Sequence, residues 1–169
     1  MHGQNGLKSS QQSFPKPRGG VSARGKTRLV FFQKGTRMTA QCYVDEVLEA
    51  EVARAGDTIF GGTPWVFQQD SASCHTAKRT LKWLKDNQIE FISPEEWPPN
   101  SPDLSPLDFS IWALLEQRAW KAKPSTLEEM KQALLAAWDE LPLSTLQNVT
   151  QAVPARLNKL IEAGGGHFE

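Results

Sequence analysis

The alternation of apolar and helical segments between residues 65 and 92 constrains the fold of this chain most strongly. A short apolar run at 65–67 is followed by a helical pattern at 76–87 and by a second apolar run at 89–92. Strands joined by a crossover helix with short connections run parallel, because the helix returns the chain to the edge from which it started. The order therefore predicts an α/β fold.

The segments before this unit add to the predicted sheet. Residues 21–23 are interpreted as the end of a strand, residues 24–26 as a turn, and the apolar run at 29–32 as a further strand. Thr39 is expected to cap a helix that Gly56 stops.

A proline-rich segment at 94–105 separates the predicted sheet from a helical C-terminal portion. Its prolines exclude regular structure, so an irregular loop is expected. Three helical stretches follow, and Pro154 should kink or split the third. Capping boxes are expected at Ser125 with Glu128 and at Ser144 with Gln147. Apolar stripes are expected at Leu107, Ile111, Leu114 and Leu115 and at Leu127, Met130 and Leu134.

The charge distribution divides the chain into a basic tail and one domain. The formal net charge is zero, yet the first 44 residues hold eight Lys and Arg and no Asp or Glu. Residues 1–19 are rich in Gly, Ser, Gln, Lys and Pro and are expected to be disordered, and residues 20–169 form the predicted domain. A basic segment attracts polyanions, although a solvated tail is the alternative.

Neither a cysteine-based site nor a membrane span is expected. Cys42 and Cys74 belong to no C-x-x-C pair, so the sequence indicates no zinc site and no disulfide framework. No apolar run is long enough to span a membrane.

Asp70 and Asp108 are the candidate site residues. Asp70 follows the apolar run at 65–67 after two glutamines, and ligands of open α/β sheets bind at the carboxyl ends of strands. Asp108 lies three residues after Ser105 at a predicted helix start. As an alternative, Asp70 and Asp108 would only cap local turns or helix ends. For Asp103, a further acid nearby, local backbone capping is the better explanation. Together the two carboxylates would form part of a two-metal site for phosphoryl transfer, where several carboxylates hold two Mg²⁺ ions.

Two longer motifs resemble those of mariner-type transposases. Residues 67–78, Phe-Gln-Gln-Asp-Ser-Ala-Ser-Cys-His-Thr-Ala-Lys, resemble the second-aspartate motif of that family. Residues 97–112 resemble its third-acid motif, in which Asp108 stands five residues after the aspartate of Ser-Pro-Asp. Thirty-seven residues lie between Asp70 and Asp108, a spacing that resembles one mariner-like subgroup.

The resemblance implies a fold and a chemistry. The fold would be an incomplete RNase H-like α/β fold, a mixed sheet flanked by helices, with a helical C-terminal portion. The chemistry would be metal-dependent cleavage and strand transfer of DNA in the nucleus. Asp70 and Asp108 would be the catalytic residues and the ligands of Mg²⁺ or Mn²⁺, and transposon ends would be the DNA partner.

The resemblance also implies that the first catalytic aspartate is missing. The family carries this residue on its first strand, but no acid precedes Asp45, which lies in the middle of a predicted helix. We therefore expect a catalytically inactive chain, truncated at its N-terminus and also without the family's helix-turn-helix region. An inner strand would become an exposed edge, which favours self-association. The alternatives are an active nuclease completed by a missing exon or a partner chain, and a non-catalytic module that binds DNA or protein.

Further residues of the first motif have open interpretations. The family pattern has a histidine at the position of His75, where a structural hydrogen-bonding role is expected. Lys78, Lys82 and Lys85 are expected on one helix face, either as contacts to DNA phosphates or as a plain solvated surface.

Overall fold

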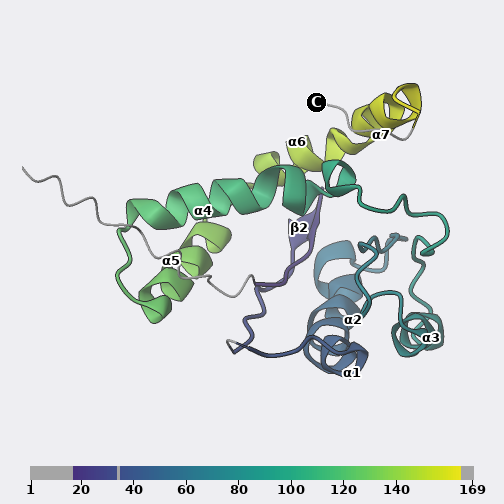
Figure 1. The fold of residues 1–169 in the computed structure, drawn as a ribbon, viewed down its shortest axis with the longest axis horizontal. Coiled ribbons are helices and arrows are strands. Elements are labelled where there is room, and N and C mark those ends of the chain that lie inside the picture. The colour runs from purple at the N-terminus through teal and green to yellow at the C-terminus, as the bar shows by residue number, and fades with distance from the viewer. Residues whose placement is uncertain (1–16, 34, 165–169) are drawn as a thin grey trace, which may run out of the picture.

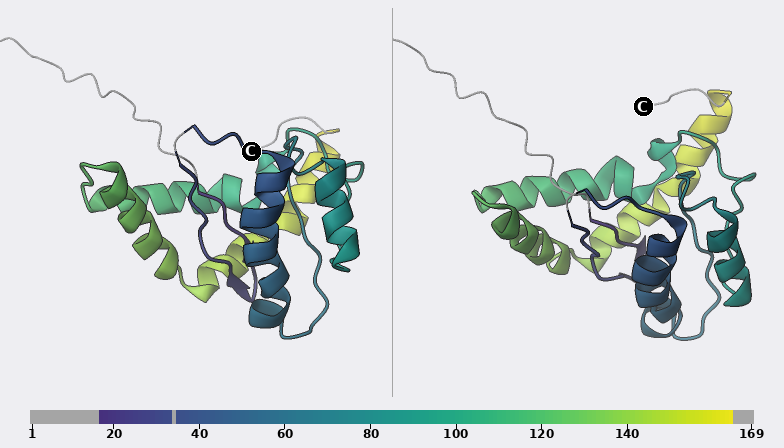
Figure 2. Two further views of the ribbon diagram at one scale, coloured as in Figure 1. Left: turned by 90° about the horizontal axis from the view of Figure 1, so that it is seen from below. Right: turned by 60° about the horizontal axis from the view of Figure 1, so that its bottom comes forward.

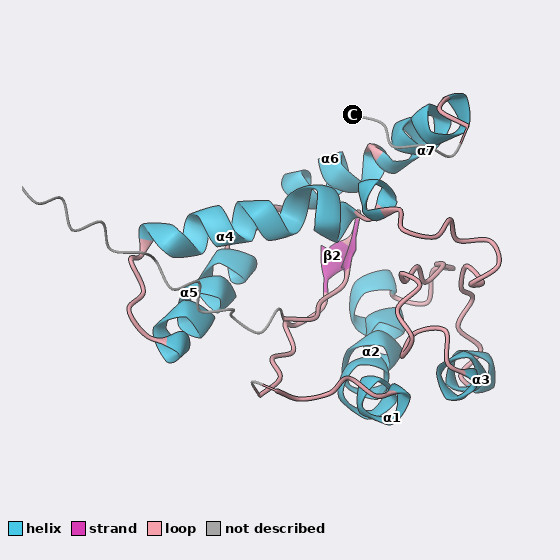
Figure 3. Cartoon of the chain, in the orientation of Figure 1, coloured by secondary structure: helices cyan, strands magenta, loops and turns pink. Residues whose placement is uncertain are grey.

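The computed structural model describes residues 17–33 and 35–164, and this part of the chain is mainly helical (Figure 3). The expected basic tail lies mostly outside these ranges. Arg18 is nevertheless paired through its backbone with Val30, with N···O distances of 2.9 and 2.8 Å. The described structure therefore includes residues before the predicted domain boundary at Gly20.

The N-terminal segment forms an antiparallel hairpin. β1 (Val21–Ser22) pairs with β2 (Gly25–Lys26), and the turn occupies residues 23–24 rather than 24–26. We call residues 18–30 the hairpin, since the bridge between its first and last residues closes it.

The strand predicted at 29–32 is wrong, because only Val30 makes a bridge there. The ladder is interrupted between β2 and this bridge. The Gly20 N–H donates to the side-chain Oγ1 of Thr27, at 2.8 Å, and the Thr27 N–H donates to the Gly20 carbonyl, at 3.0 Å. A side chain thus replaces one backbone partner, and the remaining segment is extended without regular pairing.

A long helix follows at residues 40–60, and we call it the 40–60 helix. Thr39 caps it as predicted, because its side chain accepts a hydrogen bond from the Cys42 N–H at 3.2 Å. Gly56 does not stop the helix but keeps a helical conformation, with φ −50°. The helix ends at Gly61, whose φ of 56° lies in the left-handed region that glycine adopts without steric cost. Its consecutive parts are α1 (Ala40–Tyr43), η1 (Val44–Val52), α2 (Ala53–Ala55) and η2 (Gly56–Phe60), of which η1 and η2 have π-type hydrogen bonding.

The predicted strand, helix, strand unit is present in reduced form. Its helix is α3 (Lys78–Asp86), and Phe67 and Phe91 form one parallel bridge. The parallel direction is confirmed, whereas two full strands are not formed. Both extended segments are short and border prolines, Pro64 and Pro94, which donate no backbone hydrogen bond to a longer ladder.

The C-terminal portion is helical, as predicted. The capping box lies one residue later than expected, with Thr126 and Glu129 as its partners. The box predicted at Ser144 is wrong, since the last two helices begin after Pro142 and at Val153 without a side-chain cap. No helix in the described ranges is long and apolar enough to cross a bilayer. The elements are η3 (Pro102–Leu104), η4 (Leu107–Ile111), α4 (Trp112–Lys121), α5 (Leu127–Asp139), α6 (Leu143–Gln151) and α7 (Val153–Glu162).

Two apolar cores form on opposite sides of the hairpin (Figures 1 and 2). The first lies among α4, α5 and α6 and is centred on Trp138, which is 1% exposed. The second lies between the 40–60 helix and α3, with Leu48 and Leu84 fully buried. Most of the predicted stripe residues join the first core, but Leu127, the first residue of α5, is exposed.

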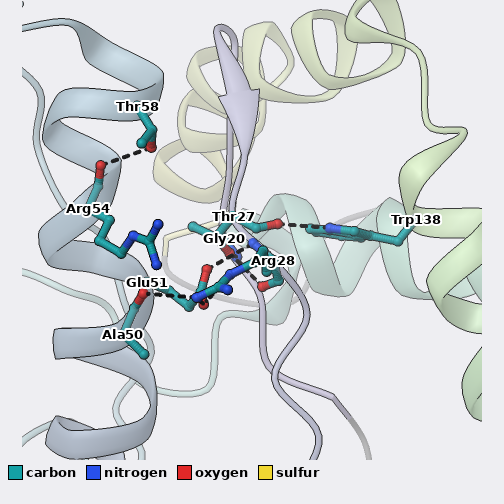
Figure 4. Close-up of polar contacts among 8 residues, drawn as sticks. All are labelled: Gly20, Thr27, Arg28, Ala50, Glu51, Arg54, Thr58 and Trp138. Atoms are coloured by element: carbon teal, nitrogen blue, oxygen red, sulfur yellow. Dashed lines mark hydrogen bonds and ion pairs between the residues drawn. The ribbon is translucent and has the colours of Figure 1, made fainter.

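Polar contacts fasten the hairpin to both sides (Figure 4). The buried carboxylate of Glu51 accepts hydrogen bonds from the Arg28 backbone N–H, at 3.0 Å, and from the Arg28 guanidinium, at 2.9 Å. On the other side, the indole N–H of Trp138 donates to the Thr27 carbonyl at 2.8 Å. Successive residues of the hairpin thus connect it to the 40–60 helix and to α5.

We expect the substitution Glu51→Ala to lower the free energy of unfolding by about 1–3 kcal/mol, because it leaves the Arg28 backbone donor without its acceptor. Urea unfolding followed by tryptophan fluorescence measures the change. The matched control is Glu46→Ala, an exposed carboxylate on the same helix, which should change stability by less than about 0.5 kcal/mol. Equal effects of the two substitutions would contradict the role of Glu51.

Candidate metal centre

Asp70 lies just beyond the carboxyl end of the parallel pair, as predicted. Phe67 is bridged to Phe91, and the chain continues through Gln68 and Gln69 to Asp70. The side chain of Asp70 is 53% exposed. A carboxylate at this edge of an α/β arrangement is in the usual place for a ligand-binding group.

The loop after Asp70 folds back on its carboxylate. Oδ1 of Asp70 accepts a hydrogen bond from the Ala72 N–H at 3.0 Å and lies 2.5 Å from Nδ1 of His75. The backbone N–H of His75 donates to the Ala72 carbonyl at 2.8 Å, which closes a turn over residues 72–75. The structural hydrogen-bonding role expected for His75 is therefore confirmed, and its partner is the candidate ligand itself.

These contacts make Asp70 a stronger acid than usual. The hydrogen bond from His75 is the main cause, and it lowers the pKa of Asp70 to about 2. The hydrogen bond from the Ala72 N–H and the positive charge of Arg18 also lower the pKa of Asp70, whereas partial burial raises it. Asp70 is thus a carboxylate over the whole physiological pH range.

Asp108 lies in the first turn of η4, after the proline-rich loop. Its N–H donates to the Ser105 carbonyl at 2.9 Å, and its side chain is exposed. α7 braces this turn from outside, because the guanidinium of Arg156 lies 3.9 Å from the ring centroid of Phe109 and donates to the Asp103 carbonyl at 3.2 Å. The helix start predicted for Asp108 is therefore present.

Both candidate residues line one cavity of about 250 Å³. The hairpin, the 40–60 helix, residues 65–70 and the segment from Ser105 to Trp112 contribute to its wall. Asp70, His75 and Asp108 all line it. The structure thus places on one cavity the two carboxylates that the motifs singled out.

The donor set fits a loosely held Mg²⁺ or Mn²⁺. Carboxylate oxygens are the ligands that these hard cations prefer, and Mg²⁺ in proteins often has only one or two carboxylates, completed by waters and substrate phosphates. Within the described ranges no three His, Cys, Asp or Glu side chains are grouped closely enough to enclose a cation. Within the described residues the cavity therefore presents two candidate carboxylate ligands and no closed cage.

Sequence reasoning missed several residues around Asp70. Arg18 falls in the predicted tail, yet it lines the cavity and its charge acts on Asp70. Tyr43 donates its hydroxyl to Oε1 of Gln69 at 3.0 Å, and Nε2 of Gln69 donates to the His75 carbonyl at 3.2 Å. The basic N-terminal run indicates that Arg18 can act on a negative charge. No local pattern indicates the contact between Tyr43 and Gln69, which are 26 residues apart.

The lysines of α3 differ in their surroundings. Lys82 pairs with Asp86 at 2.6 Å, as an i, i+4 pair on the helix surface. Lys78 and Lys85 are exposed and make no ion pair with a described residue. The helix begins three residues after His75, so its first turn lies next to the loop that carries Asp70.

The chain is similar to known proteins over part of its sequence and over most of its fold. No protein-family model matches the chain. Over 104 residues the chain is 33% identical to the Tcb1 transposable element transposase of Caenorhabditis briggsae and 30% identical to the Tc1 transposable element transposase of Caenorhabditis elegans. Each alignment covers 62% of this chain and 37% of the relative. The chain thus spans little more than a third of the length of these curated relatives.

Solved structures extend the similarity to most of the chain. The Mos1 transposase catalytic domain with raltegravir and Mn matches with a TM-score of 0.72 at 18% identity, over 91% of this chain and 82% of that one. The Mos1 transposase paired-end complex with left transposon end matches with a TM-score of 0.73 at 21% identity, over 87% and 42%. The chain therefore has the fold of the Mos1 catalytic domain. The predicted incomplete RNase H-like fold is confirmed, with a two-stranded sheet in the described residues.

We expect the Asp70 carboxyl to titrate far below the usual aspartate value of 3.8, with a midpoint near pH 2. Because the pKa is lowered on folding, the stabilising contact is fully present above about pH 4 and is lost as the pH falls through about 2. Carboxyl ¹³C chemical shifts in chelator-treated protein measure the titration. A carboxyl that is already mostly protonated at pH 3 would contradict the contact with His75.

Proposed function

We propose that this chain is the later part of the catalytic domain of a mariner-type DNA transposase, a metal-dependent nuclease of the DDE superfamily. One observation carries the proposal most directly. In a chain with the fold of the Mos1 catalytic domain, Asp70 and Asp108 line the same cavity. Sequence identity to the Tcb1 and Tc1 transposases supports the same reading.

In this proposal Asp70 and Asp108 hold Mg²⁺ or Mn²⁺ and act on DNA phosphodiesters, in the nucleus. When bound, the ions would activate the attacking oxygen and stabilise the leaving oxygen of an in-line displacement. Asp70 presents a charged carboxylate, since its pKa is lowered to about 2. The exposure of both carboxylates leaves room for the DNA phosphate, whose oxygens would complete the coordination.

The polypeptide of 169 residues supplies two acids to a site that uses three in the family it resembles. No Asp or Glu occurs in it before Asp45, which is exposed on the 40–60 helix and accepts a hydrogen bond from Gln41. Fewer ligand oxygens lower the affinity for the ions and leave the second ion poorly held. We therefore propose that this polypeptide binds metal weakly and does not cleave DNA by itself.

An active enzyme completed by another polypeptide is the alternative. Gly19 and Val21 line the cavity from the hairpin, and Val66 and Gln68 line it from the opposite side. Along a strand, every second residue points its backbone N–H and C=O away from the strand it is paired with. These four residues would therefore offer backbone groups to an extended segment of another chain. Completion by a second copy requires self-association, so a purified chain that sediments as a monomer would exclude a second copy as the completing polypeptide.

We expect no Mg²⁺- or Mn²⁺-dependent nicking of supercoiled plasmid by the purified chain, because this polypeptide does not supply the first catalytic aspartate. Gel electrophoresis of the plasmid measures nicking, and Asp70→Ala is the control. Metal-dependent nicking that is lost in Asp70→Ala would overturn the inactive assignment and favour the completed enzyme. Nicking that persists in Asp70→Ala would point to a contaminating nuclease.

We also expect non-specific binding of duplex DNA that weakens as the salt concentration rises, because Lys and Arg side chains release counterions from phosphates. The double substitution Lys78→Gln and Lys85→Gln should lower the slope of log affinity against log salt by about 2. Fluorescence anisotropy of a labelled duplex measures the slope. The matched control is Lys121→Gln with Lys123→Gln, exposed lysines at the far end of α4. An equal change in both variants would exclude a specific role for α3.

A further inference from the structure

His75 is a buried histidine with one polar partner. Its exposed fraction is 6%, and Nδ1 lies 2.5 Å from Oδ1 of Asp70. Nε2 is also buried and has no hydrogen-bond partner among the described residues. The bond to Asp70 is therefore the polar contact that orients the imidazole. A side chain selected for packing alone would not leave a buried nitrogen unpaired, because that costs free energy that an apolar side chain avoids.

The two oxygens of Asp70 are used unequally. Oδ1 accepts from both the Ala72 N–H and the His75 ring. No contact within the described part of the chain engages Oδ2. An ionised carboxylate can only accept a hydrogen bond, so a bond between these two atoms requires Nδ1 of His75 as its donor. This arrangement fixes the rotation of the carboxylate and leaves one oxygen free.

The imidazole is itself held in place. The rings of Tyr43 and His75 pack with centroids 4.3 Å apart, at an interplanar angle of 39°. Gln69 connects the hydroxyl of Tyr43 to the backbone carbonyl of His75. The 40–60 helix thus supports the histidine that supports Asp70, and the carboxylate needs no rearrangement to present its free oxygen.

We propose that His75 is a positioning residue for the metal centre, which engages Oδ1 of Asp70 so that Oδ2 alone is presented to the divalent cation. This inference rests on the proposed function. Hydrogen bonds to a ligating side chain orient it and typically change metal affinity by about 10–100-fold when they are lost. His75 acts only through Asp70 and touches neither the cation nor the DNA.

The test uses the full chain and Mn²⁺ alone as the probe, with free Mn²⁺ measured by electron paramagnetic resonance. His75→Asn places an amide N–H near the position of Nδ1, whereas His75→Gln places it near Nε2. We expect His75→Asn to stay within about threefold of the wild-type affinity and His75→Gln to lose about tenfold. The control is Glu46→Gln, which changes an exposed carboxylate of the 40–60 helix outside the cavity lining and leaves the contact between His75 and Asp70. It should bind Mn²⁺ with the wild-type affinity.

A second measurement needs no metal. The ¹⁵N shifts of His75 report which ring nitrogen carries the proton, and we expect a protonated Nδ1 in the wild type and a changed pattern in Asp70→Asn. Thermal unfolding of each variant confirms that it is folded at the assay temperature.

The outcomes separate the inference from the proposed function. Wild-type Mn²⁺ binding that is insensitive to Asp70→Ala would overturn the metal site and the proposed function with it. Two outcomes would leave the proposed function standing and overturn the role of His75. In one, Asp70-dependent binding of Mn²⁺ is as strong in His75→Gln as in the wild type. In the other, it is equally weak in His75→Asn and His75→Gln. A proton on Nε2 rather than Nδ1 would also overturn the role of His75.

Discussion

The double attachment of the hairpin at residues 18–30 is the constraint on which the rest of the structure depends. Arg28 is held by the buried carboxylate of Glu51 on the 40–60 helix, and the adjacent Thr27 is held by the indole of Trp138 on α5. Among the described residues no extensive sheet joins the two apolar cores, so the hairpin contacts are the polar link between them. The cavity that contains both carboxylates lies where the hairpin meets the 40–60 helix and the start of η4.

The two carboxylates reach this cavity through different kinds of structure. Asp70 is oriented locally, by a turn of six residues that returns the Ala72 amide and the His75 ring to its own side chain. Asp108 is placed by long-range packing, because the turn that carries it is braced by Arg156 from α7. The candidate site thus combines one carboxylate that is oriented locally with one whose position depends on how the C-terminal helices pack.

This division explains which parts of the fold were predictable. Thr39 as a helix cap, the parallel direction of the pair at Phe67 and Phe91, and the break near Pro154 follow from local rules of backbone geometry, and all three are confirmed. The capping box is displaced by one residue because neighbouring Ser125 and Thr126 are both good caps. Gly56 is tolerated inside a helix whose end is decided by Gly61, since burial of the helix outweighs the weak propensity of one residue.

By itself, the sequence determined the fold class, the helical C-terminal portion and the two acids of the motifs, because strand order, proline positions and residue spacing act locally along the chain. Only the tertiary structure decided how those acids are used. The contact of His75 with Asp70 depends on one side-chain rotamer. The approach of Arg18 and the cavity shared with Asp108 join segments that are distant in the sequence. Such contacts are selected by the packing of the whole domain, and no periodicity in the chain encodes them.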